Sequence, residues 1–307
     1  MVPAAQFTLF DKRKDFTWVK QGISGGFSVP LFIVEMVFRN VVVKERKVMI
    51  SSRNNPKLKR IKKLQTSSKA RNEENVFVVE GPKMVFEVPP GGLLECFVGE
   101  SFFNKNKDKI IKEGCSYELV SDECFGLLSD TKTPQGILGV IKQPEVLLEE
   151  LWGGGEQTPL LLFLESIQDP GNLGTIVRTA EAAGVTGIIM NGKCADIYNP
   201  KTIRSTMGAI YRMPSLVVSN FEETLAKGKA LGVKLVATHT KATKNYDEEN
   251  YQEAVGFIIG NESVGLSPSS LQWAHQWVKI PMKGQAESLN AAVATGILIY
   301  EAYRQRG

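Results

Sequence analysis

Three glycine- and asparagine-bearing segments in the second half of the chain carry most of the residues suited to chemistry. They cover residues 165–172, 260–265 and 281–290, and each follows a short apolar run that predicts a buried strand. The carboxyl ends of parallel strands meet at one edge of an open α/β sheet, where ligands bind. We therefore expect the three segments to converge on one pocket.

Side chains in and beside these segments suit a ligand that carries hydroxyls or a positive charge. Glu262 lies between Gly260 and Gly265, and glycines at the end of a strand let the backbone approach a ligand closely. An acid placed there suits sugar hydroxyls or a cationic group. Arg178 follows Asn172 by six residues on a predicted helix, near the carboxyl end of the preceding strand.

The elements that must position these segments alternate between strand and helix. Apolar runs predict strands, and helical spacing with a cap or a proline predicts helices. In chain order we expect a strand over 160–164, a helix over 173–183 capped by Asn172, a strand over 187–190, a helix from Asn199 and Pro200, a strand over 216–218, a helix over 221–230, strands over 233–238 and 254–259, a helix from Pro268, a strand over 278–280 and a helix over 291–304. This order is the β–loop–α–β pattern of a parallel sheet, and by itself it predicts an ordinary open sheet.

The preceding residues, 49–144, predict a smaller α/β layer that opens with a basic segment. From Arg53 to Arg71 the chain has eight Lys or Arg residues and no Asp or Glu, while Leu58, Ile61 and Leu64 form a narrow apolar stripe. One face should pack and the other should be cationic. Such a surface binds phosphates by releasing counterions, which favours a nucleic acid over a merely solvated face. The candidate contacts are Arg53, Lys57, Lys59, Arg60, Lys62 and Lys63.

Two stretches fall outside this pattern. Residues 145–159 contain Trp152 followed by three glycines, and we expect a linker there between domains at 49–144 and 160–307. Residues 1–48 are expected to be an extension. Two interpretations of it stay open, a poorly ordered segment or upstream sequence ahead of a true start at Met49.

Composition excludes several classes of protein. The chain has 307 residues, 43% hydrophobic and 23% charged, with a net charge of +4, which excludes wholesale disorder and a coiled coil. The four cysteines lack C-x-x-C spacing and there are two histidines, so we expect no metal site. No apolar run reaches the roughly 18 residues of a membrane span. The run from Gly187 to Cys194 approaches a phosphate loop but lacks the hydroxyl that would hold magnesium.

Together, the three segments resemble the three motifs of the SpoU family of RNA ribose 2′-O-methyltransferases, within the SPOUT superfamily. The motifs read Asn172-x-Gly174-x-x-x-Arg178-Thr179-Ala180, Gly260-Asn261-Glu262-x-x-Gly265 and Ile280-Pro281-Met282-x-Gly284-x-x-x-Ser288-Leu289-Asn290. The resemblance covers residues 160–305, and residues 53–141 resemble the family's accessory RNA-binding domain, with a ribosomal-protein-like α/β fold. One small departure is Ala291-Ala292, where the family commonly has Val-Ser or Val-Ala.

The resemblance implies a fold, a cofactor, partners and residue roles. It implies a trefoil knot in the parallel sheet, S-adenosylmethionine as methyl donor, and a cytoplasmic homodimer with its site at the subunit interface. The implied catalytic residues are Arg178, Asn172, Ser288, Asn290 and Glu262. The implied cofactor-binding residues are Thr238, Gly260, Ile280 and Leu289. Because a sulfonium methyl is already activated, the enzyme must mainly position the acceptor oxygen and aid its deprotonation. Arg178 either acts as base or only orients phosphate and hydroxyl. A guanidinium keeps its proton at physiological pH and has no acceptor for another, which favours orientation.

We therefore predict methyl transfer from S-adenosylmethionine to a ribose 2′-hydroxyl of structured RNA. The separate N-terminal domain favours ribosomal over transfer RNA. The predicted partners are RNA and a second copy of the chain, with no membrane and no metal. Two alternatives stay open, namely a transfer RNA 2′-O-methyltransferase and a non-catalytic RNA-binding or ribosome-assembly protein. A dinucleotide-dependent enzyme is disfavoured because the chain lacks G-x-G-x-x-G.

Overall fold

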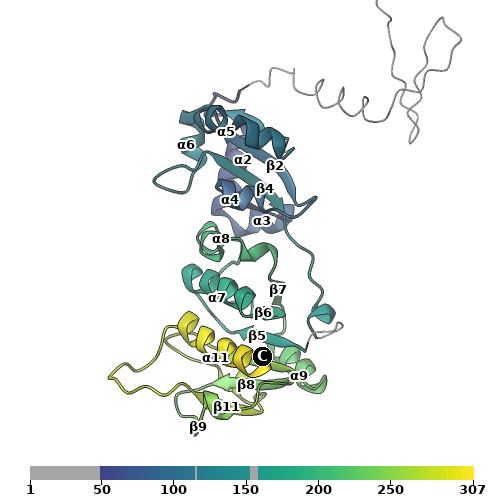
Figure 1. Cartoon of the computed structure of the whole chain (residues 1–307), viewed down its shortest axis with the longest axis vertical. Helices are drawn as coiled ribbons and strands as arrows, with labels where there is room; N and C mark the ends of the chain where they lie inside the picture. The colour runs from purple at the N-terminus through teal and green to yellow at the C-terminus, as the bar shows by residue number, and fades with distance from the viewer. Residues whose placement is uncertain (1–48, 115, 153–157) are drawn as a thin grey trace, which may run out of the picture. The chain divides into compact units, whose positions relative to one another are not determined.

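The structure is a computed structural model that describes residues 49–114, 116–152 and 158–307. The expectations for residues 1–48, and for residues 153–157 of the linker, lie outside the described residues. The described chain folds around a four-stranded sheet and a seven-stranded sheet (Figure 1).

The four-stranded sheet is built from residues 76–142 in the order β1-β4-β2-β3. Its strands are β1 (Val76–Glu80), β2 (Leu93–Gly99), β3 (Glu118–Val120) and β4 (Ile137–Lys142). Strand β4 is antiparallel to β1 and β2, and β2 is parallel to β3. The helices of this part are α2 (Pro56–Thr66), α3 (Ser68–Glu74), α4 (Pro82–Phe86), α5 (Glu100–Lys112) and α6 (Asp122–Leu128).

Helix α2 confirms the folding pattern expected of the basic segment. Asn55 caps it, with its side chain accepting from the backbone N–H of Lys57, and a proline occupies the first turn. Leu58, Ile61 and Leu64 are buried, so the apolar stripe faces the core.

The seven-stranded sheet has the order β7-β6-β5-β10-β8-β11-β9, and each neighbouring pair is parallel. Its strands are β5 (Leu160–Leu164), β6 (Gly187–Asn191), β7 (Ser215–Val218), β8 (Lys234–Thr238), β9 (Lys244–Asn245), β10 (Val255–Ile259) and β11 (Gln276–Lys279). The expected parallel sheet is confirmed. Strand β9 was not predicted, because two residues show no periodic pattern. The trefoil knot stays a prediction.

Helices cover both faces of this sheet, which explains why β5 is apolar throughout. Leu160, Leu162 and Leu164 pack into one core cluster with α7 (Pro170–Ala182) and α11 (Ala291–Arg306). The alternate residues, Leu161 and Phe163, pack into a second cluster with α9 (Phe221–Ala230). Two short helices, α8 (Pro200–Thr206) and α10 (Pro268–Leu271), and the 3₁₀ turns η2 (Leu148–Trp152), η3 (Ala209–Tyr211) and η4 (Tyr246–Glu248) complete this part.

The start of α7 differs from the sequence prediction. Asp169, not Asn172, is the N-cap, and its Oδ1 accepts from the backbone N–H of Asn172 at 2.8 Å. The dipeptide Asp169-Pro170 combines a preferred cap with a residue suited to the first helical position, so the helix starts earlier. This start leaves the side chain of Asn172 free for other contacts.

Helices α7 and α8 pack closely at a glycine. A Cβ atom on Gly174 would lie 2.5 Å from the carbonyl oxygen of Thr202 and from the Cβ of Ser205. Only glycine therefore allows this approach. None of the helices in the described chain is long and apolar enough to cross a membrane.

Candidate active site

The three predicted loops meet at the side chain of Asn172. Its Nδ2 donates to Oε1 of Glu262 at 2.5 Å, and its Oδ1 accepts from Nδ2 of Asn290 at 2.9 Å. These residues follow β5, β10 and β11, and they are separated by up to 118 positions in the sequence. We call Asn172, Glu262 and Asn290 the Asn172 cluster. The predicted convergence of the three loops is confirmed.

Asn290 also begins helix α11. Its Oδ1 accepts from the backbone N–H groups of Ala292 at 3.0 Å and Val293 at 3.2 Å. One amide therefore caps a 16-residue helix through its oxygen and holds Asn172 through its nitrogen. The orientation of the Asn172 amide is fixed from both sides, because Glu262 can only accept and Asn290 can only donate there.

Asn261 is a second link between the loops, and it was not among the predicted site residues. Its Nδ2 donates to the carbonyl oxygen of Ser166 at 3.0 Å, while its Oδ1 accepts from the N–H groups of Ser263 and Val264. The signal was present in the sequence, since an asparagine at the start of a loop commonly bonds the backbone two residues on.

Asp169 also lies at the site and was not among the predicted site residues. Its Oδ2 accepts from Nζ of Lys201 on α8 at 3.2 Å. Hydrogen bonding to the N–H of Asn172, followed by the bond from Lys201, lowers the pKa of this carboxyl. Asp169 is therefore ionised at neutral pH and connects the start of α7 to α8.

The side chains of Arg178 and Ser288 have no polar partner in the described chain. Both are exposed, and neither forms a hydrogen bond or ion pair within the described part of the chain. A surface salt bridge therefore does not account for Arg178. Its guanidinium is available for a ligand.

The predicted cofactor residues lie at one edge of the parallel sheet. Thr238 ends β8, Gly260 follows β10 and Ile280 follows β11, and these three strands are neighbours in the order β10-β8-β11. A Cβ atom on Gly260 would lie 2.4 Å from the carbonyl carbon of Gly265, so the loop can fold back only on a glycine. Leu289 is half-buried just before α11.

This donor set fits a nucleoside-bearing ligand. It consists of backbone groups, one hydroxyl and apolar side chains, which suit a neutral adenosine. The carboxylate of Glu262 stands in the loop that follows β10, within reach of the same edge. No group of side chains in the described residues could hold a metal ion.

The basic segment is only partly available to RNA. Arg53 pairs with Glu123, Lys57 with Glu118, and Arg60 with both Glu74 and Glu95. The acids come from other elements, so the absence of acids between residues 53 and 71 did not reveal them.

The remaining candidates, Lys59, Lys62 and Lys63, are exposed and form no ion pair within the described chain. Arg71, unlike these lysines, is buried. Its side chain is 3% exposed and pairs with Asp196 in the loop after β6, and its Nη1 donates to the carbonyl oxygen of Leu64 at 2.5 Å. It is a structural residue of the junction between the two sheets.

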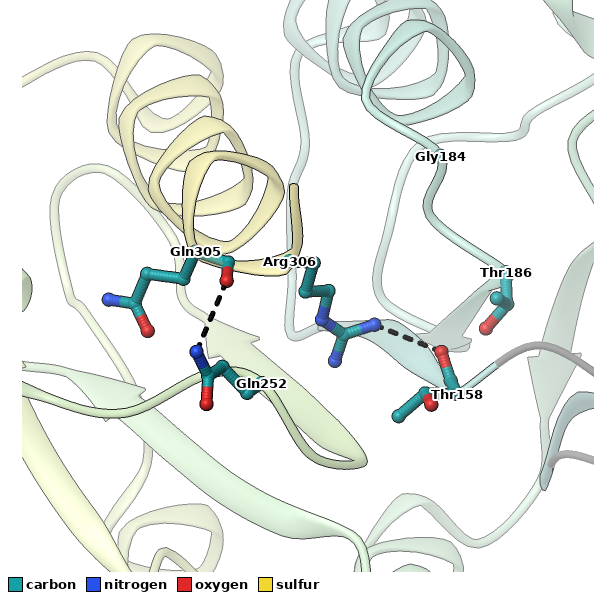
Figure 2. A pocket seen from close by; sticks show the side chains of 6 residues that line it. All are labelled: Thr158, Gly184, Thr186, Gln252, Gln305 and Arg306. Atoms are coloured by element: carbon teal, nitrogen blue, oxygen red, sulfur yellow. Dashed lines mark hydrogen bonds between the residues drawn. The ribbon is translucent and has the colours of Figure 1, made fainter.

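A cavity of about 520 Å³ lies at the opposite edge of the parallel sheet (Figure 2). Among its lining residues, Thr158 precedes β5, Thr186 precedes β6 and Gln252 precedes β10. Figure 2 shows Arg306 directed at Thr158, whose carbonyl oxygen accepts from Nη1 at 2.9 Å. The guanidinium also donates to the carbonyl oxygens of Pro159, Tyr251 and Glu253. Arg306 therefore fastens the end of α11 to the sheet.

Comparison with known proteins agrees with this arrangement. Residues 159–300 match the model of the SpoU rRNA Methylase family, and residues 55–139 match the MRM3-like substrate binding domain. The chain is 35% identical over 256 residues to the Bacillus subtilis 23S rRNA (guanosine(2553)-2'-O)-methyltransferase RlmP, covering 82% of this chain and 97% of that protein.

Solved structures give the same result. The SpoU methyltransferase AviRb from Streptomyces viridochromogenes, in complex with AdoMet, matches with a TM-score of 0.74 and 26% identity, covering 82% of this chain and 98% of that one. An AdoMet-bound rRNA methyltransferase from Sinorhizobium meliloti matches with a TM-score of 0.73 and 31% identity, covering 84% and 97%. With its three loops joined at Asn172 and relatives matched over nearly their full length, the chain belongs to the SpoU rRNA methylase family.

Proposed function

We propose that this protein transfers a methyl group from S-adenosylmethionine to a ribose 2′-hydroxyl of ribosomal RNA. The observation that carries the proposal is the Asn172 cluster, in which three loops far apart in sequence meet beside the carboxyl ends of β10, β8 and β11. The names of the relatives support ribosomal over transfer RNA, since both RlmP and the 35% identical RlmB of Pseudomonas putida are named for 23S rRNA. With ribosomal RNA as its substrate, we propose that the enzyme acts in the cytoplasm.

Thr238, Gly260, Ile280 and Leu289 hold the donor in this proposal. When bound, S-adenosylmethionine supplies a methyl group already activated on a sulfonium. The protein's own residues then need to place the acceptor oxygen in line and exclude other nucleophiles. Backbone groups on adjacent strand ends suit this task because they are rigid.

Arg178 orients the acceptor nucleotide in this proposal. Its guanidinium is free of partners in the described chain and matches the planar geometry of a phosphate. Bound to the phosphate beside the target ribose, it favours loss of the hydroxyl proton electrostatically. Glu262 and Asn290 fix the side chain of Asn172, which contacts the ribose in this proposal. The exposed hydroxyl of Ser288 lies in the same loop as Asn290.

A second copy of the chain completes the enzyme in this proposal. Helix α11 exposes Val293, Tyr300 and Tyr303 at 53%, 47% and 53%, and Val264 beside the Asn172 cluster is 86% exposed. Exposed apolar side chains along a helix that begins at the Asn172 cluster are typical of an interaction surface. Analytical ultracentrifugation should therefore give twice the mass of the single chain.

The test is the variant Arg178→Ala with large-subunit ribosomal RNA as acceptor. Methyl transfer should fall by about 10²- to 10³-fold, the usual effect of removing one electrostatic contact to the transition state. Affinity for S-adenosylmethionine, measured by calorimetry, should stay unchanged. Arg212→Ala is the matched control, since that exposed arginine pairs with Glu181 and is expected to leave transfer intact. Full transfer by Arg178→Ala would refute the assignment.

A further inference from the structure

Residues 129–136, which join α6 to β4, form an exposed loop that several hydrogen bonds hold in place. The carboxylate of Glu80, at the end of β1, holds both ends of this loop. It accepts from the hydroxyl of Ser129 at 2.8 Å and from the backbone N–H of Gln135 at 2.9 Å. A loop closed by a single carboxylate has few conformations left to lose on binding.

Bonds within the loop restrict it further. The N–H of Thr131 donates to the hydroxyl of Ser129 at 3.1 Å, and the hydroxyl of Thr131 donates to the carbonyl oxygen of Thr133 at 2.8 Å. Two positions beside the loop require glycine, one after Glu80 and one at the end of the loop. Gly81 has a φ of +105° and Gly136 a φ of +77°, and a Cβ on either would lie within 2.4 Å of a neighbouring side chain.

The same loop is connected to the candidate active site through α8. Asp130 Oδ2 accepts from Nη1 of Arg204 on α8 at 2.8 Å. One turn earlier, Lys201 bonds Asp169, whose other oxygen accepts from the N–H of Asn172. The loop, α8 and the Asn172 cluster are therefore joined by a continuous set of bonds.

The loop carries one lysine that is free for an anion. Its two nearby acids already have partners, since Asp130 pairs with Arg204 and Glu80 accepts hydrogen bonds from Ser129 and Gln135. Lys132 is exposed and pairs with no acid in the described part of the chain. Nearby, Gln65 at the end of α2 donates to the carbonyl oxygen of Leu128, which places the start of the loop beside the helix that carries Lys62.

We propose that residues 129–136 bind the phosphodiester backbone of the RNA, with Lys132 as the cationic contact and with Glu80 and Arg204 as positioning residues. The proposal extends the proposed function, because it names a contact for the same RNA outside the catalytic loops. An ordered loop with a free cation favours a phosphate backbone, since its charge is already placed before binding. Binding residues are disproportionately found on surface loops that a rigid scaffold positions.

The test compares Lys132→Ala with Lys107→Ala, which removes the same charge from an exposed lysine of α5 that also has no ion pair in the described residues. Affinity for a transcript of large-subunit ribosomal RNA is measured by filter binding at several salt concentrations. Lys132→Ala should weaken binding roughly three- to tenfold and lower the slope of log affinity against log salt by about 1. Lys107→Ala should change neither quantity.

Glu80→Gln provides the second arm, because it keeps the shape of the side chain and removes its charge. Hydrogen exchange in residues 129–135 should become faster, and affinity for RNA should fall while affinity for S-adenosylmethionine stays constant. Equal RNA affinities for Lys132→Ala and Lys107→Ala would overturn the proposal. Methyl transfer is scored separately on the unaltered chain. A chain that binds RNA through Lys132 but transfers no methyl group would contradict only the proposed function.

Discussion

Substitutions at Asn290 can separate its two roles, capping α11 and holding Asn172. Asn290→Ala removes the cap on Ala292 and Val293 and the bond to Asn172. Losing an N-cap costs about 1 kcal/mol, and losing one exposed hydrogen bond costs roughly another 0.5–1.5 kcal/mol. The free energy of unfolding should therefore fall by about 2 kcal/mol. For a chain of this size, that corresponds to a decrease in Tm of roughly 4–8 °C.

Asn290→Asp keeps the cap but cannot donate to Asn172. The carboxylate oxygen still accepts from the first turn of α11, and its negative charge is favourable at a helix N-terminus by about 0.3–1 kcal/mol. However, two acceptor oxygens then face each other where Asn290 now donates to Oδ1 of Asn172. We expect a Tm near that of the unaltered chain and a large loss of methyl transfer.

The assays are thermal unfolding followed by circular dichroism and transfer of a radiolabelled methyl group to ribosomal RNA. Asn220→Ala is the control, because Asn220 caps α9 by accepting from the N–H of Glu223 at 3.1 Å and has no bond to the Asn172 cluster. It should lower stability by about 1 kcal/mol and leave transfer unchanged. Full activity of Asn290→Asp would show that the bond to Asn172 has no role in the reaction. An unchanged Tm for Asn290→Ala would show that the capping argument is wrong.

Two further predictions concern buried charges. Burial alone would raise the pKa of Glu249, but hydrogen bonds from Lys234 and Lys244 outweigh it and lower the pKa to about 2. The ionised carboxylate of Glu249 stabilises the folded chain fully above pH 4.5, which is its ordinary pKa, and this contribution is lost as the pH falls toward 2. Glu249→Gln should therefore flatten the acid limb of a plot of Tm against pH. Arg71→Met should lower the free energy of unfolding in urea by roughly 3–5 kcal/mol, because it leaves the carboxylate of Asp196 without its buried ionic partner. Arg53→Ala breaks an exposed ion pair and should lower it by at most about 1 kcal/mol. Similar losses for the two variants would contradict the burial argument.

Local signals in the sequence were sufficient for most elements and for the convergence of the loops. The apolar runs at 160–164 and 255–259 are buried strands, and Asn199-Pro200 opens a helix, because hydrophobic spacing and capping act over a few residues. Convergence at Asn172 followed from the rule that parallel strands place their carboxyl ends at one edge. The shift of the α7 cap to Asp169 shows the limit of such signals, because two capping residues three positions apart competed for one position.

The sequence by itself determined the succession of strands and helices, the glycine- and asparagine-bearing loops between them and the membership of the chain in its family. Only the tertiary structure decided which charges remain free. Arg53, Lys57 and Arg60 lie in a segment without acids, yet each pairs with a glutamate supplied by another part of the chain. Arg71, a member of the same run, is buried against Asp196. The physical reason is that an ion pair depends on distance in space, and chain folding brings together residues that no local pattern connects.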